Sequence, residues 1–277
     1  MKARLMNGAG NRFVLLDVRG QAGLLEIRRS QVRQWARQHG FDQLLALEDS
    51  DQGDAFMRIW NADGDEVGAC GNGTRAAGWV LLEESGAETV SIATAAGLLS
   101  ARRAGSFQVS VDMGRPGLDW QSIPLSRQAD TVEVDIRYDV GGVVIERPGA
   151  VNMGNPHAVF FIRDVETFPV AKLGPEVEMD PVFPERVNVS FGQIYDPGHI
   201  RLRVWERGVG ITAACGTAAC ATLVAAHRRG LAERTASIMA DGGELHIEWR
   251  ESDDHGILTG PVEDEGAVEL SWEKSGE

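Results

Sequence analysis

Lysine is scarce in this sequence. Only Lys2, Lys172 and Lys274 occur, and arginine supplies the remainder of the 27 basic residues. A pyridoxal-phosphate enzyme needs a lysine in a buried site to form its Schiff base. Here the lysines fall at the N-terminus, in an expected loop between Pro169 and Pro175, and in the charged C-terminal tail. The sequence therefore disfavours pyridoxal phosphate as a cofactor.

The sequence also lacks an excess of positive charge and long apolar runs. Of the 277 residues 41 are acidic, and the net charge is −14. Because phosphate groups bind positive surfaces, this charge argues against a nucleic-acid or membrane partner. No run approaches the ~18 apolar residues of a membrane span, and the first residues lack the apolar core of a signal peptide. We therefore expect a cytoplasmic protein that acts on a small molecule.

Cysteine is the third rare residue. The chain has Cys70, Cys215 and Cys220, an odd number without a Cys-x-x-Cys pair. This pattern excludes a disulfide framework and a zinc ribbon, and we expect no metal site.

The two halves of the chain resemble each other at an offset of 145 residues. Over residues 57–76 and 202–221, six positions are identical without a gap, and Cys70 falls on Cys215. An earlier pair of segments, 7–11 and 152–155, matches at nearly the same offset. Repeated marks in one order indicate a duplicated unit. We expect an N-terminal half, 1–117, a C-terminal half, 118–262, and a tail, 263–277, that returns to the first half as a strand ending near Trp272.

Each half shows a strand, a loop and an apolar helix. Residues 55–60 and 200–205 alternate as half-buried strands do, and helices are expected over 74–82 and 217–226. A helix that is apolar on every face is buried on all sides. Further alternating strands are expected at 109–111, 131–136, 158–162 and 244–249. The predicted fold is α+β, with two pseudo-symmetric domains that each surround a central apolar helix with a barrel-like or sandwich sheet.

The equivalent cysteines stand at the expected helix starts, each followed by glycine. Backbone N–H groups at a helix N-terminus favour negative charge, which suits both a thiolate and a bound carboxylate. Inverting an α-carbon requires a base on one face and an acid on the other. A symmetric pair, Cys70 and Cys215, would supply both. Cys220 lies inside the second helix and is expected to pack in the core.

Three other interpretations stay open from these residues. Cys70 and Cys215 could be buried structural residues, a redox pair of a thiol peroxidase or sensor, or part of a non-catalytic amino-acid-binding protein.

Five blocks together resemble diaminopimelate epimerase. They are residues 7–11 (Asn-Gly-Ala-Gly-Asn), 61–64 with 70–75 (Asn-Ala-Asp-Gly and Cys-Gly-Asn-Gly-Thr-Arg), 152–157 (Asn-Met-Gly-Asn-Pro-His), 186–188 (Arg-Val-Asn), and 205–208 with 214–217 (Trp-Glu-Arg-Gly and Ala-Cys-Gly-Thr). The resemblance runs from residue 1 to about 262, with the blocks in the family's order. Two positions depart from the family, Asn7 for the commoner histidine and Arg12 for an acidic residue, and both are expected to affect local packing. Proline and hydroxyproline racemases are the alternative within the superfamily, but they normally carry His where this chain has Asn72.

The resemblance implies cofactor-independent epimerisation of L,L- to meso-2,6-diaminopimelate, in lysine and peptidoglycan biosynthesis. It assigns Cys70 and Cys215 as acid/base thiols, with His157 and Glu206 orienting or activating them. Contacts to the substrate are assigned to Asn11, Gln43, Asn61, Gly71, Asn72, Asn155, Asn188, Glu206, Arg207, Gly216 and Thr217. Arg58 and Arg75 are expected to form structural or surface ion pairs. A homodimer is the assembly to test.

Overall fold

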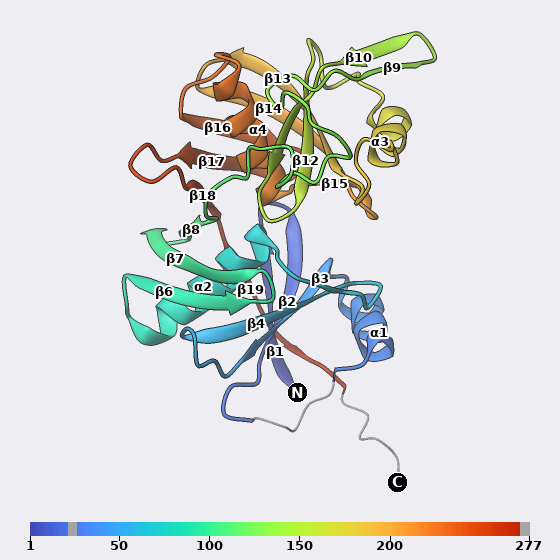
Figure 1. Ribbon diagram of the computed structural model, residues 1–277. Helices are drawn as coiled ribbons and strands as arrows, with labels where there is room; N and C mark the ends of the chain where they lie inside the picture. Colours follow the sequence, from blue (N-terminus) through green and yellow to red (C-terminus); the bar gives the residue numbers. More distant parts are fainter. Residues whose placement is uncertain (22–26, 272–277) are drawn as a thin grey trace. The chain divides into compact units, whose positions relative to one another are not determined.

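The chain folds as two units, which a computed structural model describes over residues 1–21 and 27–271 (Figure 1). Unit 1 holds Met1–Val111 and the described residues from Gly260 onward, and unit 2 holds Asp112–Thr259. Trp272, the expected end of the tail strand, lies outside the described residues. No helix among the described residues is long and apolar enough to cross a membrane.

The described residues of unit 1 form two helices and most of nine strands. The helices are α1 (Arg29–His39) and α2 (Gly71–Ser85). The strands are β1 (Lys2–Gly8), β2 (Asn11–Asp17), β3 (Gln43–Glu48), β4 (Ala55–Asn61), β5 (Glu66–Val67), β6 (Thr89–Thr94), β7 (Gly97–Gly105), β8 (Gln108–Asp112) and β19 (Glu263–Glu269).

Unit 2 repeats this order of elements after an added hairpin. The hairpin strands are β9 (Arg137–Val140) and β10 (Val143–Glu146), and the helices are α3 (Val170–Glu178) and α4 (Gly216–Arg228). The remaining strands are β11 (Gly149–Asn152), β12 (Pro156–Phe161), β13 (Asn188–Asp196), β14 (His199–Glu206), β15 (Gly210–Thr212), β16 (Thr235–Ala240), β17 (Gly243–Trp249) and β18 (Gly256–Pro261).

The pairing of strands is the same in both units. β1–β2 and β11–β12 are antiparallel, whereas β2–β3 and β12–β13 are parallel. β3–β4 and β13–β14 are antiparallel, and β4–β6 and β14–β16 are again parallel. A matching succession of parallel and antiparallel ladders is the structural counterpart of the sequence repeat.

A buried helix stands at the centre of each unit. α2 packs on β1, β2, β3, β6 and β7, and α4 packs on the equivalent strands β11, β12, β13, β16 and β17. The side chains from Gly71 to Leu82 and from Gly216 to Ala226 are all buried. Because these helices have almost no polar face, only a surrounding sheet can shield them from water. The predicted α+β fold with a central apolar helix in each half is confirmed.

Two local predictions are wrong. Residues 131–136 form no strand, because single hydrogen bonds, such as Val134 N–H to the Pro148 carbonyl, replace a continuous ladder. The alternation reflects burial alone, since Val132, Val134 and Ile136 are less exposed than Glu133 and Asp135. Lys172 lies on helix α3 rather than in a loop, since Pro169 occupies the N-cap, where its missing N–H costs nothing.

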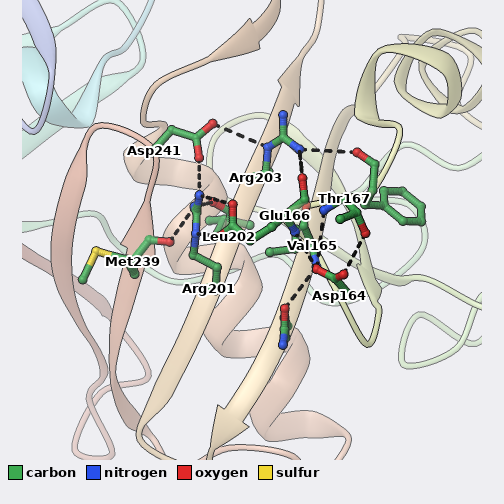
Figure 2. A network of polar contacts seen from close by, with 11 residues as sticks. Asp164, Val165, Glu166, Thr167, Arg201, Leu202, Arg203, Met239 and Asp241 are labelled. Atoms are coloured by element: carbon green, nitrogen blue, oxygen red, sulfur yellow. Dashed lines mark hydrogen bonds and ion pairs between the residues drawn. The ribbon is translucent and has the colours of Figure 1, made fainter.

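Ion pairs anchor the equivalent strands β4 and β14. Figure 2 shows Arg201 and Arg203 of β14 reaching Asp241, and Arg201 also donates to Glu166 at 2.6 Å. On β4, Arg58 donates to Glu66 at 2.8 Å. These arginines brace the strands, as expected for Arg58.

Candidate active site

Each of the two equivalent cysteines is the N-cap of a central helix. Cys70 has φ −152° and ψ 110°, and its Sγ accepts a hydrogen bond from the Gly73 N–H at 3.3 Å. Cys215 has φ −130° and ψ 115°, and its Sγ lies 3.4 Å from the Thr217 hydroxyl oxygen. The first backbone N–H groups of a helix have no partner within the helix and can donate to a side chain or a ligand. Both thiols therefore stand at helix ends suited to negative charge.

Three amide side chains of unit 1 lie at one end of neighbouring strands. Gln43 begins β3, Asn11 begins β2, and Asn61 ends β4. The ladder pairs Gln43 with Asn61 directly, and the Gln43 amide donates to the Asn61 Oδ1 at 2.9 Å. The strand register thus collects neutral donors and acceptors at this end of the sheet.

A chain of polar contacts runs from the start of α2 into the core of unit 1. The Asn72 amide donates a short hydrogen bond to Asn11, and Arg75 donates to the Asn72 Oδ1 at 2.7 Å. Arg75 is fully buried, so of the two expected roles, structural or surface, it has the structural one, and it supports the Asn72 amide. Asn72 is thereby fixed with its amide nitrogen toward Asn11.

Unit 2 places its candidate residues at the matching strand ends. His157 pairs with Asn188 in the β12–β13 ladder, and Glu206 ends β14. Asn188 is buried, accepts from the Arg207 N–H at 3.0 Å and donates to the Pro156 carbonyl at 3.0 Å. Asn188 therefore ties the start of β12 to the turn that follows β14.

The carboxyl group of Glu206 contacts the candidate thiol of unit 2. It hydrogen-bonds with Cys215 and accepts a short hydrogen bond from the Thr212 hydroxyl. Burial raises the pKa of Glu206 above its usual range, although both hydrogen bonds oppose that shift. This carboxyl group can therefore hold and orient the thiol of Cys215.

His157 is fully buried and neutral. Its Nε2 donates to the Asn155 Oδ1 at 2.8 Å, and burial, aided by the charge of Arg207, lowers the pKa of His157 to about 3. Its Nδ1 is buried without a hydrogen-bond partner in the described part of the chain. A neutral imidazole can orient Asn155, but it cannot supply positive charge to a thiolate.

The positions of these residues repeat at the same offset of 145. Gln43 corresponds to Asn188, Asn61 to Glu206, Gly71 to Gly216 and Asn72 to Thr217, as Cys70 does to Cys215. Each unit thus carries one half-set of strand-end polar groups and one cysteine-capped helix. The two sets differ in charge at one position, where unit 1 has the amide of Asn61 and unit 2 has the carboxyl group of Glu206.

Sequence reasoning missed three residues that support the candidate site. Thr212 holds Glu206, Arg75 holds Asn72, and Glu178 accepts from the Gly208 N–H at 2.9 Å. Arg75 lies within the block 70–75, whereas Thr212 and Glu178 lie outside the named blocks, and no nearby residue pattern indicates their role.

The two departures from the family meet at one carboxylate. Arg12 donates to Glu265 at 2.7 Å, and the Asn7 amide donates to the same carboxylate at 3.2 Å. Both residues thus tie β1 and β2 to β19, which is a local packing role.

Among the described residues, one cluster of side chains has a spacing suited to a metal ion. It consists of Asp112, Asp253 and His255. Arg250 already occupies it, donating to Asp112 at 2.8 Å and to Asp253 at 2.6 Å. A metal would have to displace this guanidinium, so the group works as an ion-pair cluster of unit 2.

Comparisons with known proteins point to one family. A family model described as Diaminopimelate epimerase matches residues 4–118 and 149–264. The chain is 52% identical to a diaminopimelate epimerase of Phenylobacterium zucineum over 260 residues, which cover 93% of each chain. It is 50% identical to one of Methylocella silvestris, covering 93% of this chain and 90% of the relative. A solved hydroxyproline epimerase from Agrobacterium vitis has the same fold, with a TM-score of 0.69 at 16% identity over 97% of this chain and 90% of the other.

Proposed function

Because this chain belongs to the diaminopimelate epimerase family, we propose that it epimerises L,L-2,6-diaminopimelate to the meso form with two thiols and no cofactor. It is an isomerase, and the reaction serves lysine and peptidoglycan biosynthesis. The observation that carries the proposed mechanism is that Cys70 and Cys215 cap equivalent buried helices.

The reaction moves one proton off the α-carbon and another onto it. One thiolate removes the α-proton and becomes a thiol, while the thiol of the other cysteine gives its proton to the opposite face and becomes a thiolate. The two cysteines exchange protonation states in each turnover, so either stereoisomer can enter. This scheme requires Cys70 and Cys215 to act from opposite faces of the substrate.

The helix starts stabilise the charge that develops during proton transfer. Backbone N–H groups of Gly71, Asn72, Gly216 and Thr217 would hold the carboxylate next to the reacting carbon. Negative charge spreads from that carbon onto the carboxylate in the transition state, and donors fixed in advance stabilise it. The dipoles of both helices also favour negative charge at their N-termini.

Glu206 and His157 act on the thiols in different ways in this proposal. Glu206 orients Cys215 through their hydrogen bond and is itself held by Thr212. His157 acts through its orientation of Asn155, since the imidazole is neutral.

The remaining polar groups recognise the two amino-acid ends of the substrate. Ammonium groups need acceptors and carboxylates need donors, and an amide side chain offers both. Arg207 supplies the fixed cation for the distal carboxylate, for which a guanidinium is suited to two parallel hydrogen bonds. The amide groups in this set are Asn11, Gln43, Asn61, Asn155 and Asn188.

Deuterium incorporation tests the proposed reaction. Wild-type protein incubated with L,L-diaminopimelate in heavy water should place one deuterium at an α-carbon as the meso form appears. Cys70→Ala and Cys215→Ala should each abolish epimerisation, whereas Cys220→Ala is the matched control that keeps it. Turnover that survives both active-site substitutions would refute the thiol mechanism.

The same experiment separates the competing activities. Exchange with trans-4-hydroxy-L-proline or proline, and none with diaminopimelate, would favour a racemase. Peroxide turnover that depends on a Cys70–Cys215 disulfide would favour a redox protein. Binding without exchange would favour an amino-acid-binding protein.

Compartment and assembly form the last part of the proposal. The thiol mechanism requires Cys70 and Cys215 to stay reduced, which favours the cytoplasm. A homodimer is the assembly we propose. Cell fractionation and light scattering test these two statements.

A further inference from the structure

Glu178, the last residue of α3, holds the turn that follows β14. Its Oε1 accepts from the Gly208 N–H at 2.9 Å, and its Oε2 accepts from the Trp205 Nε1–H at 2.7 Å. We infer that Glu178 is a positioning residue that sets the backbone of Glu206 and Arg207. The inference rests on the proposed function, which assigns both of those residues to the substrate site.

The turn is fixed on both sides of Arg207. The Arg207 N–H donates to the Asn188 Oδ1 at 3.0 Å, and the next N–H, that of Gly208, donates to Glu178. The Arg207 guanidinium donates to the Glu185 carbonyl at 2.8 Å. Gly208 has φ +75°, a conformation that glycine adopts without strain, so the residue type suits the turn that these hydrogen bonds hold. Removing Glu178 would free one of the two backbone anchors.

The duplication supplies independent support for this tether. At the offset of 145, Glu178 corresponds to Arg33 of α1, and Gly208 corresponds to Asp63. The Arg33 guanidinium donates a short hydrogen bond to the Asp63 carbonyl. A side chain of the equivalent helix thus holds the equivalent turn in each unit, with donor and acceptor exchanged. The two units therefore share the contact between helix and turn, although the residues that make it differ.

A carboxylate is suited to this position because both partners of Glu178 are N–H donors. Glu178 is 6% exposed, so water does not compete for either hydrogen bond. The amide of Gln could accept only one of these bonds and would turn an NH₂ group toward the other donor. Arg186, 3.7 Å away, adds positive charge beside the carboxylate.

Glu178→Gln should therefore weaken substrate binding more than it slows the chemistry. Loss of one charged, buried hydrogen bond corresponds to a rise in KM for L,L-diaminopimelate of about tenfold. The kcat should stay within about threefold, because Glu206 keeps its separate tether to Thr212. Glu176→Gln, an exposed position of the same helix with the same change in charge, is the control and should match wild type.

A double-mutant cycle with Arg207→Ala tests the route of the effect. If Glu178 acts through the turn, Glu178→Gln should add less than about twofold to KM in the Arg207→Ala background. An equal rise in both backgrounds, or an unchanged KM in Glu178→Gln alone, would overturn the inference. Should Glu178→Gln fail to fold, Glu178→Asp, which keeps the charge but shortens the reach, is judged by the same cycle. Absence of diaminopimelate turnover by wild type would instead refute the proposed function, and this inference with it.

Discussion

Acid should destabilise this protein through one buried histidine. His157 has a pKa of about 3 in the folded chain, because burial and the charge of Arg207 disfavour its protonated form. In the unfolded chain an imidazole titrates near its ordinary pKa of 6.5. The lowered pKa means that His157 stabilises the fold fully above pH 6.5, and that this contribution is lost as the pH falls toward 3.

The size of the effect follows from the two pKa values. At pH 5.0, about 1.5 units below the pKa of 6.5, the imidazole is protonated in the unfolded chain and neutral in the folded chain. Each pH unit below 6.5 stabilises the unfolded state by about 1.4 kcal/mol. Between pH 7.5 and pH 5.0, His157 should therefore lower the free energy of unfolding by about 2 kcal/mol.

Urea unfolding followed by tryptophan fluorescence measures this difference. His157→Gln retains a donor toward Asn155 but has no titrating group, so the drop in its free energy of unfolding between the two pH values should be smaller by about 2 kcal/mol. His246→Gln, which changes an exposed histidine of the same unit, is the control. Equal drops in wild type and His157→Gln would refute the reasoning.

Three further substitutions test other parts of the structure. Glu206→Gln should raise the free energy of unfolding at pH 8, because burial raises the pKa of this carboxyl group, and the gain should vanish below the ordinary glutamate pKa of 4.5. The same substitution should slow α-proton exchange about 100-fold. Gly174→Ala should cost about 2 kcal/mol or more in thermal unfolding, since a Cβ there would lie 2.4 Å from the Trp205 ring, whereas Gly192→Ala, with its nearest atom at 3.4 Å, should cost much less. Asn188→Leu should cost about 2–4 kcal/mol in urea unfolding, because it removes the acceptor of the half-buried Arg207 N–H and the donor to the buried Pro156 carbonyl. A loss under about 1 kcal/mol would contradict that reasoning.

The helix starts and strand ends of the candidate site were accessible from sequence. Cys70 and Cys215 are each followed by glycine in a repeated block. Where a helix starts depends mainly on neighbouring residues, so the sequence predicts both helix starts. The alternation at 55–60 and 200–205 correctly predicts β4 and β14 because both strands are half-buried. Where the local pattern of residues matches their burial in the fold, the sequence alone is sufficient to predict the element.

The supporting contacts were not accessible in the same way. Glu178 meets Gly208 across 30 residues, and that contact depends on how α3 packs on β14, which no periodicity encodes. Thr212 likewise reaches Glu206 only because β15 pairs with β14. The misassigned strand at 131–136 shows the converse, since alternating burial arises there without a partner strand.

The pairing of β1 with β19 has a consequence for the order in which the chain assembles. Lys2 pairs with Glu269, and the N-terminal ammonium of Met1 donates to the Leu270 carbonyl at 2.6 Å. Unit 2 is one continuous stretch, so all of its residues have emerged from the ribosome once Thr259 has done so. β1 must wait until β19 has been synthesised before the ladder between them can close, with the entropy cost of a very long loop. Synthesis from the N-terminus therefore favours completion of unit 2 first, and unit 1, although translated earlier, is finished last.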